Sequence, residues 1–357
     1  MANLKTSVDN AKTDKPFLYA TMANNQKNVA IGASFTLSIF QFNLSPLEEI
    51  HLPLYKGSTL RGGFGHAFKR VVCIQKRREC SDCMVKSTCV YSYVFETSPP
   101  EDTEILRLYK NVPHPFVIEP PLTSQRIFKK GEEITFNLVL IGKAIRYLPY
   151  FIYTFDELGR IGIGKGKGKF HLKSVTSEIK GHGTEDKSEN AGENGIIYSV
   201  EDKILHNHFR VITAKDIFAS NNSPSEIEIE FLTPTRMVFN ERLVAEIEFH
   251  HIIRTLLRRI SSLSYFHCGE LLELDFKKLI ENAENIQCTD SKLRWYDWER
   301  YSARQDTRMK MGGVIGRAVF EGDLEEFMPL IALGEYVHVG KGTSFGLGKY
   351  AILEIKF

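Results

Sequence analysis

The residues of this sequence best suited to move protons are histidines that lie beside cations and glycines. His66 belongs to a segment, 58–72, in which the apolar residues Leu60, Phe64 and Phe68 recur at helical spacing. On such a helix His66 lies opposite the apolar stripe, where an anionic group could approach it. Histidine titrates near neutral pH and serves as general base or general acid, so this face favours acid–base chemistry. The alternative is a surface histidine without a role. Its neighbours on the face are Gly62, Gly63, Lys69 and Arg70.

Two glycine-rich turns, 159–168 and 338–348, each separate a predicted helix from a predicted strand. Glycine lets the backbone approach a ligand, and successive N–H groups can bind phosphate oxygens. His338 begins the second turn, so its imidazole and the Lys341 ammonium could meet one phosphate, which makes His338 a second candidate proton carrier. Neither turn has the pattern of a nucleotide-binding loop, and a tight helix-to-strand connection is the alternative. The predicted phosphate contacts in the turns are Lys165, Lys167, Gly340, Lys341, Gly342, Gly346 and Gly348.

Basic residues gather in three stretches, although the formal charge of the whole chain is only +2. Residues 55–89 hold eight basic and two acidic residues, 159–173 hold five basic and no acidic residues, and 291–320 hold seven and three. Aromatic residues lie among the last set, and rings that stack on bases beside cations that bind phosphates favour nucleic acid. Each stretch alone could be solvated surface. Further predicted phosphate contacts are Arg61, Lys69, Arg70, Arg300, Arg304 and Lys310.

Three arginines and the carboxylates of the sequence give two further expectations. Arg254, Arg258 and Arg259 lie on a predicted helix, where we expect a solvated face. No pair of carboxylates stands out as a magnesium site, which agrees with chemistry that needs no catalytic metal.

Four cysteines lie within seventeen residues, with the spacing Cys73-x6-Cys80-x2-Cys83-x5-Cys89. Four thiolates complete a closed tetrahedral zinc site, and in a reducing compartment such a cluster is better explained by metal than by disulfides. The pattern predicts a structural zinc site inserted after the first helix. An iron–sulfur cluster has equivalent ligands, and free thiols are the remaining alternative.

The predicted elements have the same order in both halves of the chain. In the first half they are a strand at 33–44, a helix at 58–72, strands at 115–119 and 133–142, a helix at 144–158 and a strand at 169–175. In the second half they are a strand at 226–232, helices at 249–263 and 275–286, strands at 293–302 and 309–320, a helix at 324–333 and a strand at 348–357. The repeated βαββαβ order indicates internal duplication and an α+β fold of two tandem ferredoxin-like, RRM-like domains.

The domain boundaries follow from composition. We expect a flexible segment at 1–32, a first domain at 33–175 with the cysteine-rich insertion at 73–89, a mobile insertion at 176–224 and a second domain at 225–357. The 357 residues are 43% hydrophobic and 25% charged, which fits a soluble protein. No stretch is long and apolar enough for a membrane helix, and residues 1–30 lack a signal-peptide core. The expected location is cytoplasmic.

Several of these segments together resemble the CRISPR repeat-processing endoribonucleases of the RAMP superfamily. They are the stretch 54–67, the cysteine cluster, residues 300–305 with Gly312 and Gly313, and the turn at 338–350. The resemblance implies metal-independent cleavage of precursor CRISPR RNA within each repeat, by attack of a 2'-hydroxyl on the adjacent phosphate. The products would be a 2',3'-cyclic phosphate and a 5'-hydroxyl. Similar enzymes place a tyrosine beside the histidine, which makes Tyr55 a third candidate; the alternative is a buried ring whose hydroxyl bonds to backbone.

The resemblance also implies partners. The glycine-rich loop near residue 340 would touch RNA, and the product would stay bound and pass to a CRISPR effector complex. The protein would act as a monomer or a homodimer. Two rival functions remain at this point: a RAMP subunit that binds RNA without cutting it, and a zinc-bearing RNA-binding module outside CRISPR biology.

Overall fold

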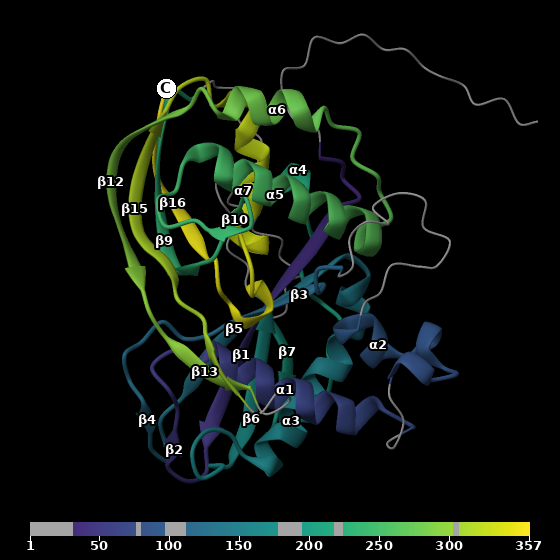
Figure 1. Cartoon of the computed structure of the whole chain (residues 1–357). Helices are drawn as coiled ribbons and strands as arrows, with labels where there is room; N and C mark the ends of the chain where they lie inside the picture. Colours follow the sequence, from purple (N-terminus) through teal and green to yellow (C-terminus); the bar gives the residue numbers. More distant parts are fainter. Residues whose placement is uncertain (1–30, 76–79, 97–111, 178–194, 218–223, 303–306) are drawn as a thin grey trace, which may run out of the picture.

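The computed structural model describes residues 31–75, 80–96, 112–177, 195–217, 224–302 and 307–357. Each half of the chain builds one antiparallel sheet (Figure 1). The first sheet has the order β3-β5-β1-β6-β7, and the second has the order β12-β15-β9-β16. When the four strands β1, β3, β5 and β6 are numbered in chain order, they lie in the sheet in the order 2-3-1-4. The strands β9, β12, β15 and β16 of the second sheet have the same order. This shared topology confirms the predicted pair of ferredoxin-like domains.

The strands of the first sheet are β1 (Thr36–Pro46), β3 (Phe116–Glu119), β5 (Ile134–Ile141), β6 (Phe170–Ser177) and β7 (Ile196–Ser199), and β8 (Ile212–Thr213) pairs with β1. The helices α1 (Gly57–Val72) and α3 (Leu148–Ile161) cover one face of it. Leu60, Phe64 and Phe68 of α1 are fully buried, as their spacing predicted. Phe64 lies 4.9 Å from the ring centroid of Phe151 and 5.0 Å from that of Phe155, so an aromatic cluster joins the two helices.

Short elements complete the first half. They are β2 (Ile50–His51) paired with β4 (Ile127–Phe128), the helix α2 (Val90–Phe95) and the one-turn helix α4 (Ala214–Ile217). The predicted insertion at 176–224 is wrong in part. Ile196–Ser199 pairs with β6 and Ile212–Thr213 pairs with β1, so these residues belong to the first sheet. Residues 178–194 and 218–223 lie outside the described residues.

The second sheet consists of β9 (Glu226–Thr235), β12 (Gln287–Tyr296), β15 (Gly313–Glu321) and β16 (Tyr350–Lys356). Its helices are α5 (Phe249–Leu263), α6 (Phe276–Ala283) and α7 (Met328–Val337). The hairpin β13 (Glu299–Ser302) and β14 (Thr307–Lys310) extends the β12–β15 ribbon, and β10 (Val238–Phe239) pairs with β11 (Arg242–Leu243). The predicted strand at 293–302 therefore begins earlier, at Gln287, and is divided between β12 and β13.

The halves share one hydrophobic core. Leu37, Val117 and Val139 of the first sheet point away from α1 and α3 and join the core that contains Ile253 and Leu256 of α5. The sheet face that serves as an RNA platform in RRM proteins is therefore covered here by the second half.

Candidate nucleic-acid interface

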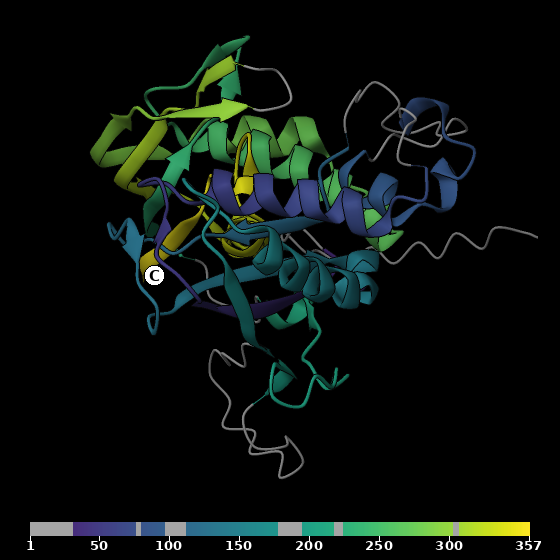
Figure 2. The same ribbon diagram turned by 90° about the horizontal axis from the view of Figure 1, so that it is seen from below.

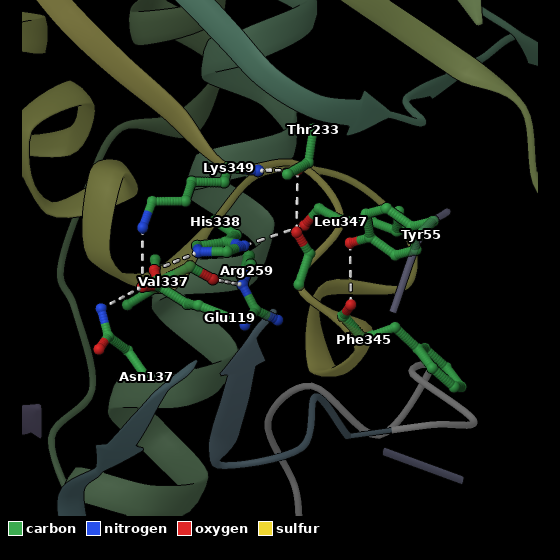
Figure 3. Close-up of polar contacts among 11 residues, drawn as sticks. Tyr55, Glu119, Asn137, Thr233, Arg259, Val337, His338, Phe345, Leu347 and Lys349 are labelled. Atoms are coloured by element: carbon green, nitrogen blue, oxygen red, sulfur yellow. Dashed lines mark hydrogen bonds and ion pairs between the residues drawn. The ribbon is translucent and has the colours of Figure 1, made fainter. Parts of the chain in front are cut away.

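The second glycine-rich turn lies at the junction of the halves and is held from both (Figure 3). The helix α7 ends at His338, whose φ of +63° turns the chain into the loop. From the first half, the Tyr55 hydroxyl donates to the Phe345 carbonyl oxygen at 2.9 Å. Gly346 has a φ of +80°, and a Cβ there would lie 2.4 Å from Cδ of Pro120. The loop thus needs glycine where it meets the end of β3.

Glu119 joins the halves by accepting hydrogen bonds from the second half (Figure 3). Its Oε1 lies 2.8 Å from Nε2 of His338, and its Oε2 lies 2.7 Å from Nζ of Lys349. Burial raises the pKa of Glu119, but the hydrogen bonds and charges of His338 and Lys349 outweigh burial and lower this pKa to about 2. The carboxylate is therefore ionised at neutral pH. We call Glu119, His338 and Lys349 the clasp.

His338 occupies a different environment from the one we expected. Its side chain is 0% exposed, its Nδ1 lies 3.1 Å from the Leu347 carbonyl oxygen, and its Nε2 faces Glu119. Burial lowers the pKa of His338, although Glu119 acts in the opposite direction. Both ring nitrogens are occupied within the protein, so the imidazole joins the two halves and does not meet a phosphate beside Lys341.

Tyr55 also has a structural environment. Its ring centroid lies 4.7 Å from that of Trp298, and its hydroxyl bonds to the backbone of Phe345. Burial, together with the charge of Glu119, raises the pKa of Tyr55 well above 10. The hydroxyl keeps its proton at neutral pH, which matches the alternative interpretation from the sequence.

A cleft of about 670 Å³ opens beside this loop, between the two halves. The loop from Gly340 to Phe345 forms one wall, and α5 contributes another. One acidic residue, Glu96, also lines the cleft. Cations beside glycine N–H groups form a surface that suits phosphate oxygens. The basic side chains that line the cleft are Arg236, Arg254, Arg258, Arg259 and Lys341.

The expectation of a solvated face on α5 holds for Arg258, which is exposed, and is wrong for Arg259. Arg254, Arg258 and Arg259 all line the cleft, and Arg259 is only 7% exposed. Arg259 Nε donates to the Val337 carbonyl oxygen at 2.7 Å, and burial lowers the pKa of Arg259 to about 9. Periodicity alone could not have placed these residues, because the first half covers a helix face that would be exposed in an isolated domain.

The residues that line the cleft include two N–H groups without a hydrogen-bond partner in the described part of the chain. They are Arg259 Nη2 and His114 Nδ1, and both are buried. Arg61 Nη2 donates to His114 Nε2 at 3.4 Å, which assigns the ring proton to Nδ1. Burial lowers the pKa of His114 to about 3, and the charges of Arg61 and Arg259 act in the same direction. His114 is therefore a neutral donor at pH 7.

Arg61 is held between the rings of Phe95 and Phe345, with its guanidinium carbon 4.8 Å from each ring centroid. The predicted phosphate contact thus lies beside the cleft, at the place where α1 meets the glycine-rich loop. Lys69 lies 5.4 Å over the ring of Tyr91, and Arg70 is exposed at the end of the helix.

His66 lies on the exposed face of α1, as the pattern predicted. Gly62 on this face has no atom within 4 Å of a hypothetical Cβ, so the helix is open to a ligand there. Gly63 instead faces α3, where its Cβ would lie 3.2 Å from Leu158. Gly57, at the start of α1, contacts the second glycine-rich loop. His66 lies nine residues further along the helix, which corresponds to about 13 Å. The structure therefore does not bring His66 and His338 together.

The first glycine-rich turn borders a second pocket of about 600 Å³. Thr59 at the start of α1 lines this pocket together with His51, Arg126 and Lys165. The Lys165 amide donates to the His51 carbonyl oxygen at 2.9 Å, which ties the turn to β2. Lys167 is exposed and has a φ of +55°. Thr59 thus borders this pocket, whereas Arg61, half a turn further along α1, contacts Phe95 and Phe345 of the first cleft (Figure 2 shows this helix from below).

The β12–β15 ribbon reaches from the second half to the first (Figure 1), where Trp298 packs on Tyr55. Arg300 lies on β13 opposite Met309, and Lys310 on β14 is exposed opposite Glu299. Arg304 lies outside the described residues. The predicted phosphate contacts of this segment thus belong to a hairpin beside the junction.

The four cysteines are all partly exposed and unbonded to one another. The Cys83 amide donates to the Cys80 carbonyl oxygen at 3.4 Å, in the tight turn that a Cys-x2-Cys motif forms. Burial raises the pKa of Cys80, and the neighbouring charges include Lys69, Glu96, Cys73 and Cys89. Three of the four sulfurs therefore share one neighbourhood. Their chemistry fits zinc, but within the described residues the four sulfurs do not form a group of ligand atoms within 4.8 Å of one another.

One cluster in the described part of the chain has ligand atoms within 4.8 Å: Glu248, His250 and His251. His250 Nδ1 accepts from Arg254 at 3.1 Å, and His251 Nδ1 accepts from the Glu248 amide at 3.0 Å. Each Nε2 therefore carries the ring proton and offers no lone pair to a metal. The arrangement fits a capping box at the start of α5 better than a metal site.

Two family models match the chain. The CRISPR-associated endoribonuclease Cas6 model covers residues 229–350, and an N-terminal domain family, AF_1859_N, covers residues 34–208. The second half of the chain therefore carries a Cas6-type domain. Cas6 is a family of RNA-cleaving enzymes, which confirms the resemblance drawn from the sequence.

Individual relatives align with most of the chain. The chain is 26% identical over 306 residues to an uncharacterized protein of Archaeoglobus fulgidus, a match that covers 85% of this chain and 93% of that protein. A Cas6 (TTHB231) product complex has the same fold, with a TM-score of 0.54, 15% identity and coverage of 89% of this chain and 99% of that chain. A partial Cas6-RT-Cas1–Cas2 complex gives a TM-score of 0.52 at 12% identity, covering 90% of this chain and 46% of that chain.

Within the described residues, none of the helices combines the length and apolar character that a membrane span requires.

Proposed function

We propose that this protein cleaves CRISPR repeat RNA in the precursor transcript without a catalytic metal. The observation that carries the proposal is the basic cleft beside the glycine-rich loop, inside a chain with a Cas6 domain. Lys341 and Arg258 are exposed at this cleft and would hold RNA phosphates. The product complex of a protein with the same fold supports retention of the cleaved RNA, and transfer to a CRISPR effector complex would follow.

In the proposed reaction the 2'-hydroxyl of one nucleotide attacks the adjacent phosphorus, and the bond to the 5'-oxygen of the next nucleotide breaks. A base takes the proton of the 2'-hydroxyl, and an acid protonates the leaving 5'-oxygen. The products are a 2',3'-cyclic phosphate and a 5'-hydroxyl. His66 is the proposed proton carrier, because it is exposed on α1 beside the open position of Gly62. His338 and Tyr55 are excluded from our proposal by their buried, internally bonded environments.

The test is cleavage of labelled repeat RNA in EDTA, with the wild type and with His66→Ala. A substrate with 2'-deoxy at the cut site serves as the chemical control. We expect cleavage in EDTA, no cleavage of the 2'-deoxy substrate, and at least a 100-fold slower rate for His66→Ala at unchanged affinity, since general acid–base catalysis contributes that much. A repeat that binds tightly and is never cut would support the non-cleaving subunit instead.

We also propose that Cys73, Cys80, Cys83 and Cys89 hold a structural zinc ion. Zinc would cross-link the segment between α1 and α2, which carries Lys86. Metal analysis of the purified protein should give one zinc per chain, and Cys83→Ser should lose it. Iron in place of zinc would indicate a cluster, and full retention of zinc by the variant would contradict the assignment.

A further inference from the structure

The lining of the cleft presents hydrogen-bond donors that the proposed cleavage does not use. Arg259 Nη2 and His114 Nδ1 line the cleft, and both are buried without an acceptor among the described residues. A buried donor without a partner is unfavourable. Two such donors in the lining of one cleft indicate a ligand that supplies the acceptors.

The depth of these donors indicates which part of an RNA they meet. Lys341 and Arg258 are exposed, so phosphates can reach them from solvent. Arg259 is only 7% exposed, and His114, which lines the same cleft, contacts the rings of Phe95 and Phe116. A single-stranded RNA that lays its backbone along the exposed cations would insert a base toward the buried donors.

We propose that the cleft binds one unpaired guanine of the repeat, with Arg259 and His114 donating to its O6 and N7 atoms. Guanine is the base whose major-groove edge offers two adjacent acceptors, and arginine reads this edge more often than any other. Adenine places an amino donor where guanine has O6, so it would meet Arg259 donor to donor. This inference rests on the proposed function, because it assumes that the ligand is repeat RNA.

The geometry around His114 makes it a specific reader and not a general cation. Arg61 donates to its Nε2, which leaves Nδ1–H as the only donor of the ring. The ring stacks on Phe116 with centroids 5.8 Å apart and an interplanar angle of 15°, so its orientation is fixed. His114→Phe keeps this packing and removes the donor. Arg259→Lys keeps the buried charge and removes the planar fork.

The experiment is a set of equilibrium binding measurements on the full-length protein. Each guanosine of the repeat is replaced in turn by adenosine or by inosine, which retains O6 and N7. We expect one position at which adenosine weakens binding about ten-fold or more while inosine does not. At that position the ratio of the two dissociation constants should fall close to one in Arg259→Lys and in His114→Phe. Lys277→Ala, which removes an exposed charge on α6, should keep the wild-type ratio.

The outcomes separate this inference from the proposed function. If the wild type binds repeat RNA no better than unrelated RNA, the proposed function fails. If the wild type binds and cuts the repeat but no guanosine shows the difference between adenosine and inosine, the guanine site is wrong. A uniform loss of affinity for all sequences in both variants would also overturn it, because this is the signature of a phosphate contact. Circular dichroism and thermal unfolding check that each variant is folded.

Discussion

Glu119 is a buried carboxylate whose charge depends on residues more than two hundred positions away in the sequence. Its pKa of about 2 lies below the ordinary value of 4.5, so the folded state binds the ionised form more strongly than the unfolded chain does. The resulting stabilisation is complete above pH 4.5 and is lost as the pH falls toward 2. The clasp therefore holds the halves together best at neutral pH.

Replacement of Glu119 by Gln tests the clasp. The variant keeps the shape of the side chain and removes the charge, so its free energy of unfolding at pH 7 should fall by about 3 kcal/mol. The difference from the wild type should shrink when both are measured at pH 3. Urea unfolding at the two pH values is the measurement. Glu133→Gln is the matched control, because Glu133 pairs with Lys173 on the surface and should contribute little. An equal loss at both pH values would contradict an electrostatic role for Glu119.

The sequence predicted the chemistry of individual residues better than their environments. His66 and His338 are equivalent as residue types beside glycine and cations, yet one is exposed and the other is 0% exposed. Burial of His338 depends on β3, which contributes Glu119 from the other half. No local pattern contains this information. For the same reason, the sequence did not predict that Arg259 and His114 line one cleft.

At the scale of elements, α1 carries both a packing face and an open face. Its apolar residues are fully buried, whereas Gly62 faces empty space in the helix interior. Glycine at such a position costs about 1 kcal/mol relative to alanine. The helix therefore gives up stability where the proposed substrate approaches.

Gly62→Ala should raise stability and slow cleavage. We expect the free energy of unfolding to rise by about 1 kcal/mol, with a midpoint about 2 °C higher, while the added methyl group hinders RNA beside His66. Thermal unfolding and the repeat-cleavage assay measure the two effects. Gly269→Ala is the comparison: it also has open space around it, but its φ of +77° should make alanine destabilising. Faster cleavage by Gly62→Ala would contradict the placement of RNA on this face.

The glycine-rich loop is held by close contact with the first half. Gly346→Ala combines a positive φ with a Cβ 2.4 Å from Pro120, so it should destabilise the protein by about 1–3 kcal/mol. Repeat binding should weaken as well, because the wall of the cleft shifts. Chemical unfolding and binding assays check both. Unchanged stability would show that the loop does not depend on this contact.

Elements with long apolar periodicity were predicted well, and short ones were not. The helix predicted at 249–263 has those bounds, because its buried stripe repeats over four turns. Ile196–Ser199 was assigned to a mobile insertion, since four residues are too few for a pattern. Pairing with β6 supplies the hydrogen bonds that make these residues a strand. The sheet order followed from the duplicated element order, but the packing of one half on the other did not.

At the scale of the whole molecule, the two halves share one core. Leu37, Val117 and Val139 would be exposed to water if the first half stood alone. Separation of the halves therefore costs apolar burial as well as the clasp. The halves should unfold together.

Differential scanning calorimetry of the full chain tests this coupling. We expect one transition at pH 7, whose calorimetric and van't Hoff enthalpies agree. Glu119→Gln should lower its midpoint without splitting it, because the shared core remains. Two separate transitions in the wild type would contradict a common core.

The packing of the halves also bears on self-assembly. The halves pack head to tail: the outer sheet face of the first lies against the helices of the second. Contacts of this type do not close on themselves, and a repeated apolar face would build a filament. On the outer face of the second sheet, Glu228 and Glu230 instead form ion pairs with Arg317. At these positions the second copy therefore does not repeat the apolar face of the first, to which a third unit would add.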